Sequence, residues 1–218
     1  MSAARRILVI NPNSNSQVTE GLSEALEGLR LTGGPEIECV TLADGPFGIE
    51  TQEHVDLVSL PLRRMVAART DVDAFVIACY ADPGLNACRE ATMKPVFGIQ
   101  ESGLLAALSR GDRVGVIALG AQSIARHLRY IRQLGLLDRL AGECPLNLSV
   151  AQSERPEAHD RLLEVGCALR DSDGADVLVL GCAGMARHRH GLEATLGLPV
   201  IDPTQAATAD ALAAVLLA

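Results

Sequence analysis

The chain has 218 residues, of which 48% are hydrophobic and only 2% aromatic, and its formal net charge at pH 7 is −8. This length suffices for one large domain or two small lobes with a sizeable core. The acidic balance without a basic stripe excludes a nucleic-acid-binding surface, and no apolar run is long enough for a transmembrane helix. We therefore expect no nucleic-acid partner, no membrane partner and, because the start MSAARRILVI does not resemble a signal peptide, a cytoplasmic protein.

In chain order, the first half alternates between expected strands and expected helices. Aliphatic runs predict strands at 6–10, 37–42, 73–78 and 95–98, and helical periodicity predicts helices at 17–30, 51–69 and 83–92. Pro61 interrupts the second helix, where we expect a kink or a late start. Continuous aliphatic strands that alternate with helices are typical of parallel sheets covered on both faces.

The second half repeats landmarks of the first at offsets of slightly more than one hundred residues. Segments 113–119, 176–181 and 199–201 match 6–10, 73–78 and 95–97 in order, which suggests an internal duplication. The sequence thus predicts an α/β fold of two pseudo-symmetric lobes, each a parallel sheet flanked by helices, with the active site in the cleft between them. We expect one lobe from 1–98 plus a returning C-terminal helix within 204–218, and the other lobe from 99–203.

The cysteines are scattered, without a CxxC pair, so neither a disulfide framework nor a zinc site is expected. Four of them are expected to be small buried hydrophobes, namely Cys39, Cys88, Cys144 and Cys167. The other two end equivalent strands of the repeat, Cys79 in ACYADPG and Cys182 in GCAGM. If the lobes face each other, both thiols flank one substrate and can remove a proton from one face and return one to the other. We expect a following helix N-terminus to lower the pKa of both thiols.

Several other polar residues follow predicted strands, where ligands bind in open α/β sheets. Asn11, Asn13 and Ser14 belong to NPNSNS, which can recognise substrate, or cap a helix through the Ser14–Gln17 spacing. Glu50 either orients a substrate nitrogen or is a solvated loop carboxylate. Asp82 is expected to be a turn and helix-cap residue. His188 and His190 are expected to lie on a solvated helix face rather than to bind a metal. Gly84 and Gly184 are expected to allow close approach of the backbone to a ligand.

Motifs for phosphate loops, dinucleotide binding, zincins and serine hydrolases do not occur in the chain. Instead, INPNSN, ACYADPGL, PVFGI, IARHL, GCAGM and PVIDPTQAA together resemble the aspartate/glutamate/hydantoin racemase superfamily, and within it the hydantoin and allantoin racemases. The resemblance implies a racemase that needs neither a metal nor another cofactor, with Cys79 and Cys182 as proton-transfer residues. It also implies ligand contacts from Asn11, Asn13 and Ser14, and backbone amides of Tyr80 and Ala183 that hold a substrate oxygen.

Departures from that branch leave the substrate open. Ala118-Leu119 stands where two threonines are common, and Gln100 and Thr51 also depart from the usual residues. One alternative is an aspartate or glutamate racemase, whose substrate carboxylate requires a basic residue or several hydroxyl donors in the cleft. Others are a maleate-isomerase-like thiol enzyme and a non-catalytic small-molecule binding protein. In each case we expect a small-molecule ligand and a homo-oligomer.

Overall fold

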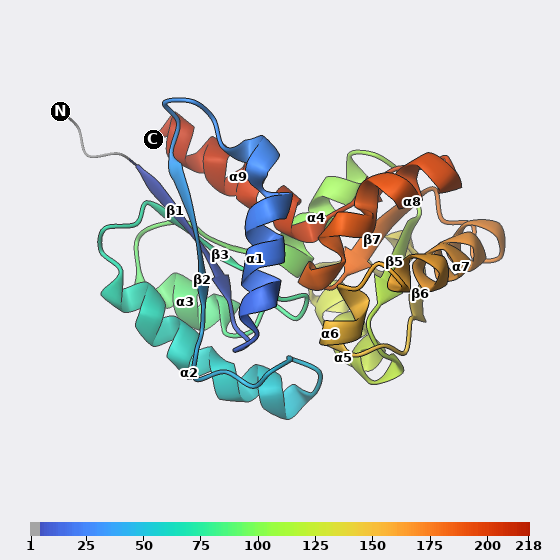
Figure 1. Cartoon of the computed structure of the whole chain (residues 1–218), viewed down its shortest axis with the longest axis horizontal. Coiled ribbons are helices and arrows are strands. Elements are labelled where there is room, and N and C mark those ends of the chain that lie inside the picture. The colour runs from blue at the N-terminus through green and yellow to red at the C-terminus, as the bar shows by residue number, and fades with distance from the viewer. Residues whose placement is uncertain (1–4) are drawn as a thin grey trace.

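The computed structural model of the protein describes residues 5–218, so the first four residues of the expected N-terminal lobe lie outside the described residues. Two four-stranded parallel sheets lie side by side, with helices packed around them (Figure 1). The first sheet contains β1 (Arg6–Asn11), β2 (Glu36–Thr41), β3 (Ala74–Ile77) and β4 (Val96–Gly98). The second contains β5 (Val114–Ala118), β6 (Leu140–Pro145), β7 (Val177–Gly181) and β8 (Val200–Ile201).

The helices connect these strands in sequence. They are α1 (Ser16–Ala25), α2 (Gln52–Ala68), α3 (Leu85–Ala91), α4 (Ile99–Leu108), α5 (Ala121–Gln133), α6 (Val150–Ser153), α7 (Ala158–Asp171), α8 (Arg189–Leu196) and α9 (Pro203–Leu217). Short 3₁₀ turns form η1 (Glu27–Leu29), η2 (Leu137–Arg139) and η3 (Ala183–His188).

The two sheets have the same topology. Their strand orders are β2-β1-β3-β4 and β6-β5-β7-β8, so each strand of the first has a counterpart at the same place in the second. The central strands β1 and β5 each pair in parallel with a neighbour on both sides. This topology confirms the predicted α/β architecture of two repeated lobes.

The core of the first lobe follows from strand alternation, because successive side chains point to opposite faces of a sheet. Ile7 and Val9 of β1 pack in one cluster with residues of α1 and α9, including Leu22. Leu8 and Ile10 pack on the other face, with residues of α2 and α3. Both faces are therefore dry, as the aliphatic runs predict.

The larger of these clusters continues from the first sheet into the second. It joins Val76 of β3 to Val179 of β7 through residues of α4 and α9. A Cβ at Gly103 of α4 would come within 2.7 Å of Pro203 in α9, so these helices pack very closely. The C-terminal helix lies against β1, β3 and β4 and also contacts β7, and α4 likewise contacts both sheets. The division into 1–98 plus 204–218 and 99–203 stays a prediction.

Two helix predictions need correction. The helix expected at 17–30 ends at Ala25 and is followed by the η1 turn, where Gly28 lowers helix propensity. Helix α2 runs unbroken through Pro61. The proline removes one backbone donor, and the carbonyl that it leaves free belongs to Leu57, which is 59% exposed and can be solvated.

No helix within the described part of the chain is both long and apolar enough to span a membrane. Among residues 5–218, no group of three or more histidine, cysteine or acidic side chains is arranged to hold a metal ion.

Candidate active site

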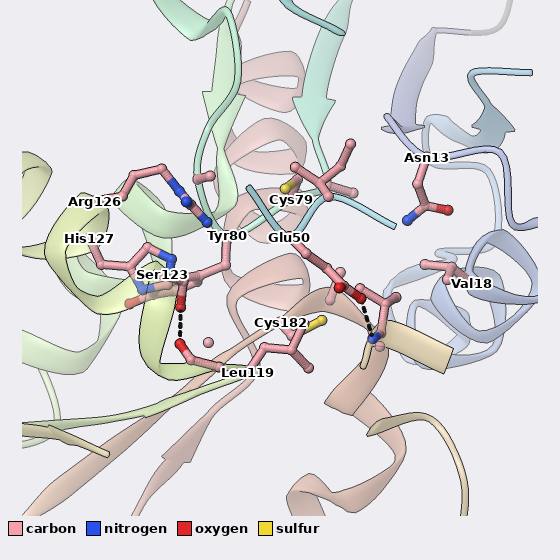
Figure 2. Close-up of a pocket in the computed structure, with 18 of the residues that line it drawn as sticks. Asn13, Val18, Glu50, Cys79, Tyr80, Leu119, Ser123, Arg126, His127 and Cys182 are labelled. Atoms are coloured by element: carbon pink, nitrogen blue, oxygen red, sulfur yellow. Dashed lines mark hydrogen bonds between the residues drawn. The ribbon is translucent and has the colours of Figure 1, made fainter. Parts of the chain in front are cut away.

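The two cysteines singled out by the repeat line the same pocket, at the carboxyl ends of the sheets. Cys79 follows β3 and Cys182 follows β7. Figure 2 shows their side chains on opposite sides of the pocket, with Glu50 between them. The other lining residues come from both lobes and are Asn13, Val18, Ile49, Ala78, Tyr80, Ala81, Leu119, Gly120, Gln122, Ser123, Arg126, His127, Val150, Gly181, Ala183 and Gly184.

A tight turn carries Cys79 and Tyr80 into the pocket. The Cys79 carbonyl accepts hydrogen bonds from the backbone N–H groups of Ala81, at 2.8 Å, and Asp82, at 3.0 Å. Asp82 itself has a left-handed conformation, with φ of 43°. Its carboxylate accepts from the N–H groups of Gln100 and Glu101, both at 2.9 Å. Asp82 lies in a turn, as predicted, but the cap prediction is wrong for the helix that follows, whose N-cap is Gly84. The Asp82 carboxylate instead caps the first turn of α4 through space.

The counterpart turn after β7 is equally crowded. A Cβ at Gly181 would lie 2.5 Å from the carbonyl oxygen of Ile117 in β5, so only glycine fits directly before Cys182. Cys182 precedes η3, and its carbonyl accepts from the N–H of Met185 at 3.2 Å. The backbone amides of Tyr80 and Ala183 have no hydrogen-bond partner among the described residues. Both are available to a ligand oxygen.

The expected lowering of the thiol pKa values is wrong for the ligand-free pocket. Burial raises the pKa of Cys182 to about 11, although the Gly184 N–H and the Ser153 hydroxyl oppose the rise. Burial also raises the pKa of Cys79, with smaller contributions from Cys182 and Asp82, against Arg126. No α-helix starts directly after either cysteine: α3 begins at Leu85, and η3 is a 3₁₀ turn. The helix N-terminus expected to stabilise each thiolate is therefore missing.

Of the three polar residues predicted after β1, only Asn13 lines the pocket. Asn11 is fully buried behind it, where its amide donates to Asn13 Oδ1 at 3.1 Å and to Thr19 Oγ1 at 3.0 Å. Ser14 is also absent from the lining, and its N–H donates to the carbonyl of Pro46. The cap of α1 is Asn15, which accepts from Gln17 N–H, rather than Ser14. Asn11 therefore positions the loop that presents Asn13.

Glu50 lies in the loop between β2 and α2 and reaches the opposite lobe. Its Oε1 accepts from the Val150 N–H at the start of α6, at 3.2 Å (Figure 2). Its own N–H donates to His54 Nδ1 at 3.3 Å. One carboxylate oxygen of Glu50 thus bridges the two lobes at the edge of the pocket. The other carboxylate oxygen makes no hydrogen bond to the described residues.

Helix α5 contributes polar residues that the reasoning from sequence missed. Gln122, Ser123, Arg126 and His127 line the pocket from the second lobe. His127 is buried, pairs with Glu143 through Nδ1 at 2.5 Å and meets the Tyr80 ring edge-on, with centroids 5.1 Å apart. The motif IARHL, noted only as part of the family resemblance, contains both Arg126 and His127 and was the available signal.

The structure confirms some of the remaining sequence predictions and contradicts others. Leu119, one of the departures, lines the pocket, whereas Ala118 is buried in β5. Cys88 is fully buried, as predicted for a packing residue. His188 is not solvated: it is 5% exposed, its Nε2 lies 3.2 Å from the Ser153 carbonyl, and it stacks on His159. Burial lowers the pKa of His188, so the neutral ring fits this environment.

The pocket between the thiols is narrow, about 40 Å³, and two wider cavities adjoin it. One, of about 640 Å³, shares Val18, Ala183 and Gly184 with it and extends along α1. The other, of about 580 Å³, shares Ala81 and Arg126 and extends between α2, α3 and α5. The narrow pocket thus shares parts of its wall with two wider cavities, one on the α1 side and one on the α5 side.

Comparisons with known proteins point to one family. A family model described as Asp/Glu/Hydantoin racemase matches residues 7–211. The chain is 36% identical over 208 residues to a hydantoin racemase from Paenarthrobacter aurescens, covering 93% of this chain and 87% of that one. It is 34% identical to a hydantoin racemase from Pseudomonas sp. (strain NS671), covering 90% and 80%. The solved allantoin racemase from Klebsiella pneumoniae superposes with a TM-score of 0.93 at 29% identity, covering 98% and 89%.

Proposed function

The chain belongs to the Asp/Glu/Hydantoin racemase family and is a racemase, and we propose that it interconverts the enantiomers of a 5-substituted hydantoin or related cyclic ureide. We further propose that the reaction needs no cofactor and that Cys79 and Cys182 transfer protons to and from the two faces of the substrate stereocentre. The observation that carries this proposal is the placement of these two thiols, one from each lobe, on opposite sides of one pocket.

The proposed reaction moves one proton off and one proton on. The thiolate of one cysteine removes the hydrogen at the stereocentre, and the electron pair of that C–H bond moves into the neighbouring carbonyl as an enolate. The thiol of the other cysteine then returns a proton to the opposite face, so that the two cysteines exchange protonation states. The free amides of Tyr80 and Ala183 would donate to the enolate oxygen, where charge develops.

The raised thiol pKa values are compatible with this role. A thiol that is hard to ionise is, once ionised, a stronger base, and a stronger base removes the weakly acidic C–H proton more readily. Each cysteine also has a group that favours its thiolate, the Gly184 N–H for Cys182 and the Arg126 charge for Cys79. Substrate that expels water from the pocket would strengthen both interactions.

Two further side chains are suited to the polar edge of a ureide. Glu50 has carboxylate oxygens at the pocket, which can accept from a ring N–H. Asn13 presents an amide that can both donate and accept. We propose that these two orient the ring, while Asn11 and Ser14 support the loop without touching the ligand. Gly184 is proposed as a backbone contact, since it lines the pocket and carries no side chain.

Deuterium incorporation tests the proposal directly. We expect wild-type protein in deuterated water, without added metal or pyridoxal phosphate, to exchange the C5 hydrogen of a hydantoin as it racemises it. Cys79→Ala and Cys182→Ala should each lower racemisation by about a thousandfold or more, since each removes a proton-transfer group. Cys144→Ala removes a thiol outside the pocket and serves as the matched control.

Circular dichroism would establish that all three variants fold. Near-normal racemisation by Cys79→Ala or Cys182→Ala would refute the two-thiol mechanism. Tight binding of hydantoins without isotope exchange by the wild type would instead indicate a binding protein.

A further inference from the structure

Arg126 is a cation in the pocket that has no counter-ion. It lies on α5, and Figure 2 shows its guanidinium directed from that helix toward the side of the pocket where Tyr80 and Cys79 lie. Its Nε is buried and has no hydrogen-bond partner, and none of the ion pairs between residues 5–218 involves it. Arg126 as a whole is half-buried, but a guanidinium whose Nε is shielded from water without an acceptor carries a desolvation cost. Such a group in a ligand pocket points to an anion on the ligand.

A second unsatisfied donor lies in the adjoining cavity. Gln100 is 1% exposed, and its Nε2 has no partner in the described structure. Gln100 and Arg126 both line the cavity of about 580 Å³ that extends from the pocket between α2, α3 and α5. Two donors that lack acceptors in one cavity fit a group with two acceptor oxygens, which is what a carboxylate offers.

The other charged groups of this cavity are already engaged. Asp82 accepts the two N–H groups that begin α4. Arg129 donates to Gln52 Oε1 at 3.0 Å, and Gln52 in turn donates to Asp56 at 2.9 Å. Arg126 is thus the cation of this cavity that remains for a ligand.

Arg126 also lies at the junction of the two spaces. It and Ala81 are the residues shared by the narrow pocket between the thiols and the wider cavity. A substituent that leaves the stereocentre on this side passes Ala81 and meets the guanidinium.

We propose that the substrate carries a carboxylate on its C5 substituent, and that Arg126, assisted by Gln100, binds it. This inference rests on the proposed function, because it assigns the substituent of the ring held between Cys79 and Cys182. It also accounts for a basic residue in the pocket, which the sequence analysis expected only for a substrate that carries a carboxylate.

A pair of nearly isosteric substrates tests the proposal. The acid is 5-(2-carboxyethyl)hydantoin, and the neutral counterpart is 5-(2-carbamoylethyl)hydantoin. We expect wild-type kcat/KM, measured by polarimetry, to be at least about tenfold higher for the acid, the size of one charge-assisted hydrogen bond. In Arg126→Gln this acid-to-amide ratio should fall about tenfold or more. Arg132→Gln makes the same change at an exposed site on α5 outside the pocket and should keep the wild-type ratio.

Two results would overturn the carboxylate site: a wild type that does not favour the acid, or an Arg126→Gln variant that loses the same factor on both substrates. Calorimetric binding of the same pair separates this failure from failure of the proposed function. One outcome is that neither compound is racemised, while the wild type binds the acid more tightly than the amide and Arg126→Gln does not. That outcome supports the carboxylate site and refutes the proposal that the protein racemises hydantoins. Equal binding of the two compounds refutes the site.

Discussion

Cys79 and Cys182 occupy equivalent places in the two lobes but have different surroundings. A cation, Arg126, faces Cys79, while Asp82 and the second thiol disfavour its ionisation. Cys182 has a backbone donor and the Ser153 hydroxyl in its favour, and Glu154 and Glu50 against it. In both cases burial is the largest effect and keeps the thiol protonated. Both thiols therefore stay protonated at neutral pH, and the proposed mechanism requires that one of them ionise first.

This resting state predicts an alkaline pH dependence. The pKa of Cys182 is about 11 and that of Cys79 is also raised, so the thiolate fraction of free enzyme grows about tenfold per pH unit in the neutral range. We expect log kcat/KM to rise with a slope near one from pH 7 to pH 9, in initial rates corrected for uncatalysed racemisation. A plateau reached by pH 8 would show that a thiolate is already present before substrate binds.

The raised pKa values of Cys79 and Cys182 also predict how the stability of the folded protein changes with pH. A cysteine whose pKa is higher in the folded than in the unfolded chain binds its proton more tightly when folded. Its contribution is complete below the unfolded value, about 8.5, and is lost as pH rises through the folded value. The folded protein is thus expected to lose stability above about pH 8.5, at the upper end of the pH range in which its activity is expected to rise.

The sequence predicted some of the residues that line the pocket and missed others for a simple reason. Cys79 and Cys182 could be found because the repeat puts each at a strand end, and strand ends of parallel sheets converge. Arg126 and Gln100 lie on α5 and α4, where the residues that face a pocket depend on how each helix packs. Asn11 and Asn13 could not be separated, because a turn decides which of two neighbouring amides points outward.

At the scale of elements, the turn after Cys79 is tied to a helix that begins seventeen residues beyond Asp82. Asp82 accepts the N–H groups of Gln100 and Glu101, and a Cβ at Gly98 would come within 2.3 Å of its carboxyl carbon. Burial raises the pKa of Asp82 to about 7 in spite of these bonds. The turn that presents Cys79 and Tyr80 is thereby held by the start of α4.

Removing this cap should destabilise the protein. Asp82→Ala leaves two buried N–H groups without an acceptor and places alanine at a positive φ, so we expect a loss of about 1–2 kcal/mol in the free energy of unfolding. Asp82→Asn retains one acceptor and tolerates the left-handed conformation, so it should lose less. Asp210→Ala, at an exposed site on α9, is the control. Urea unfolding followed by circular dichroism measures all three, and an Asp82→Ala midpoint equal to wild type would contradict the cap.

At the scale of the whole molecule, the lobes are not independent units. One hydrophobic cluster includes Val9 of β1, Val116 of β5 and Ala207 of α9, so helices α4 and α9 bury apolar surface against both sheets. Separating the lobes would expose this surface to water, and its burial opposes their separation. The two thiols are consequently held at one pocket by the core rather than by the pocket itself.

We therefore expect the two sheets to unfold together. In native-state hydrogen exchange followed by mass spectrometry, peptides from β1 and β3 should show the same opening free energy and urea dependence as peptides from β5 and β7. Exchange of the β5 and β7 peptides at a urea concentration that leaves β1 and β3 protected would show that the lobes open separately.

The amino-acid sequence alone determined the α/β class and the repeat of strands along the chain, and it placed Cys79 and Cys182 at equivalent strand ends. It could do so because aliphatic periodicity and repeat spacing are properties that can be read along the chain. It also carried the family resemblance. Only the tertiary structure decided that burial raises both thiol pKa values, that Asn11 lies behind Asn13, that Asp82 caps α4, and that Arg126 faces the pocket without a counter-ion. These properties depend on which distant groups packing brings together and how much water it removes, and neither can be read from positions along the chain.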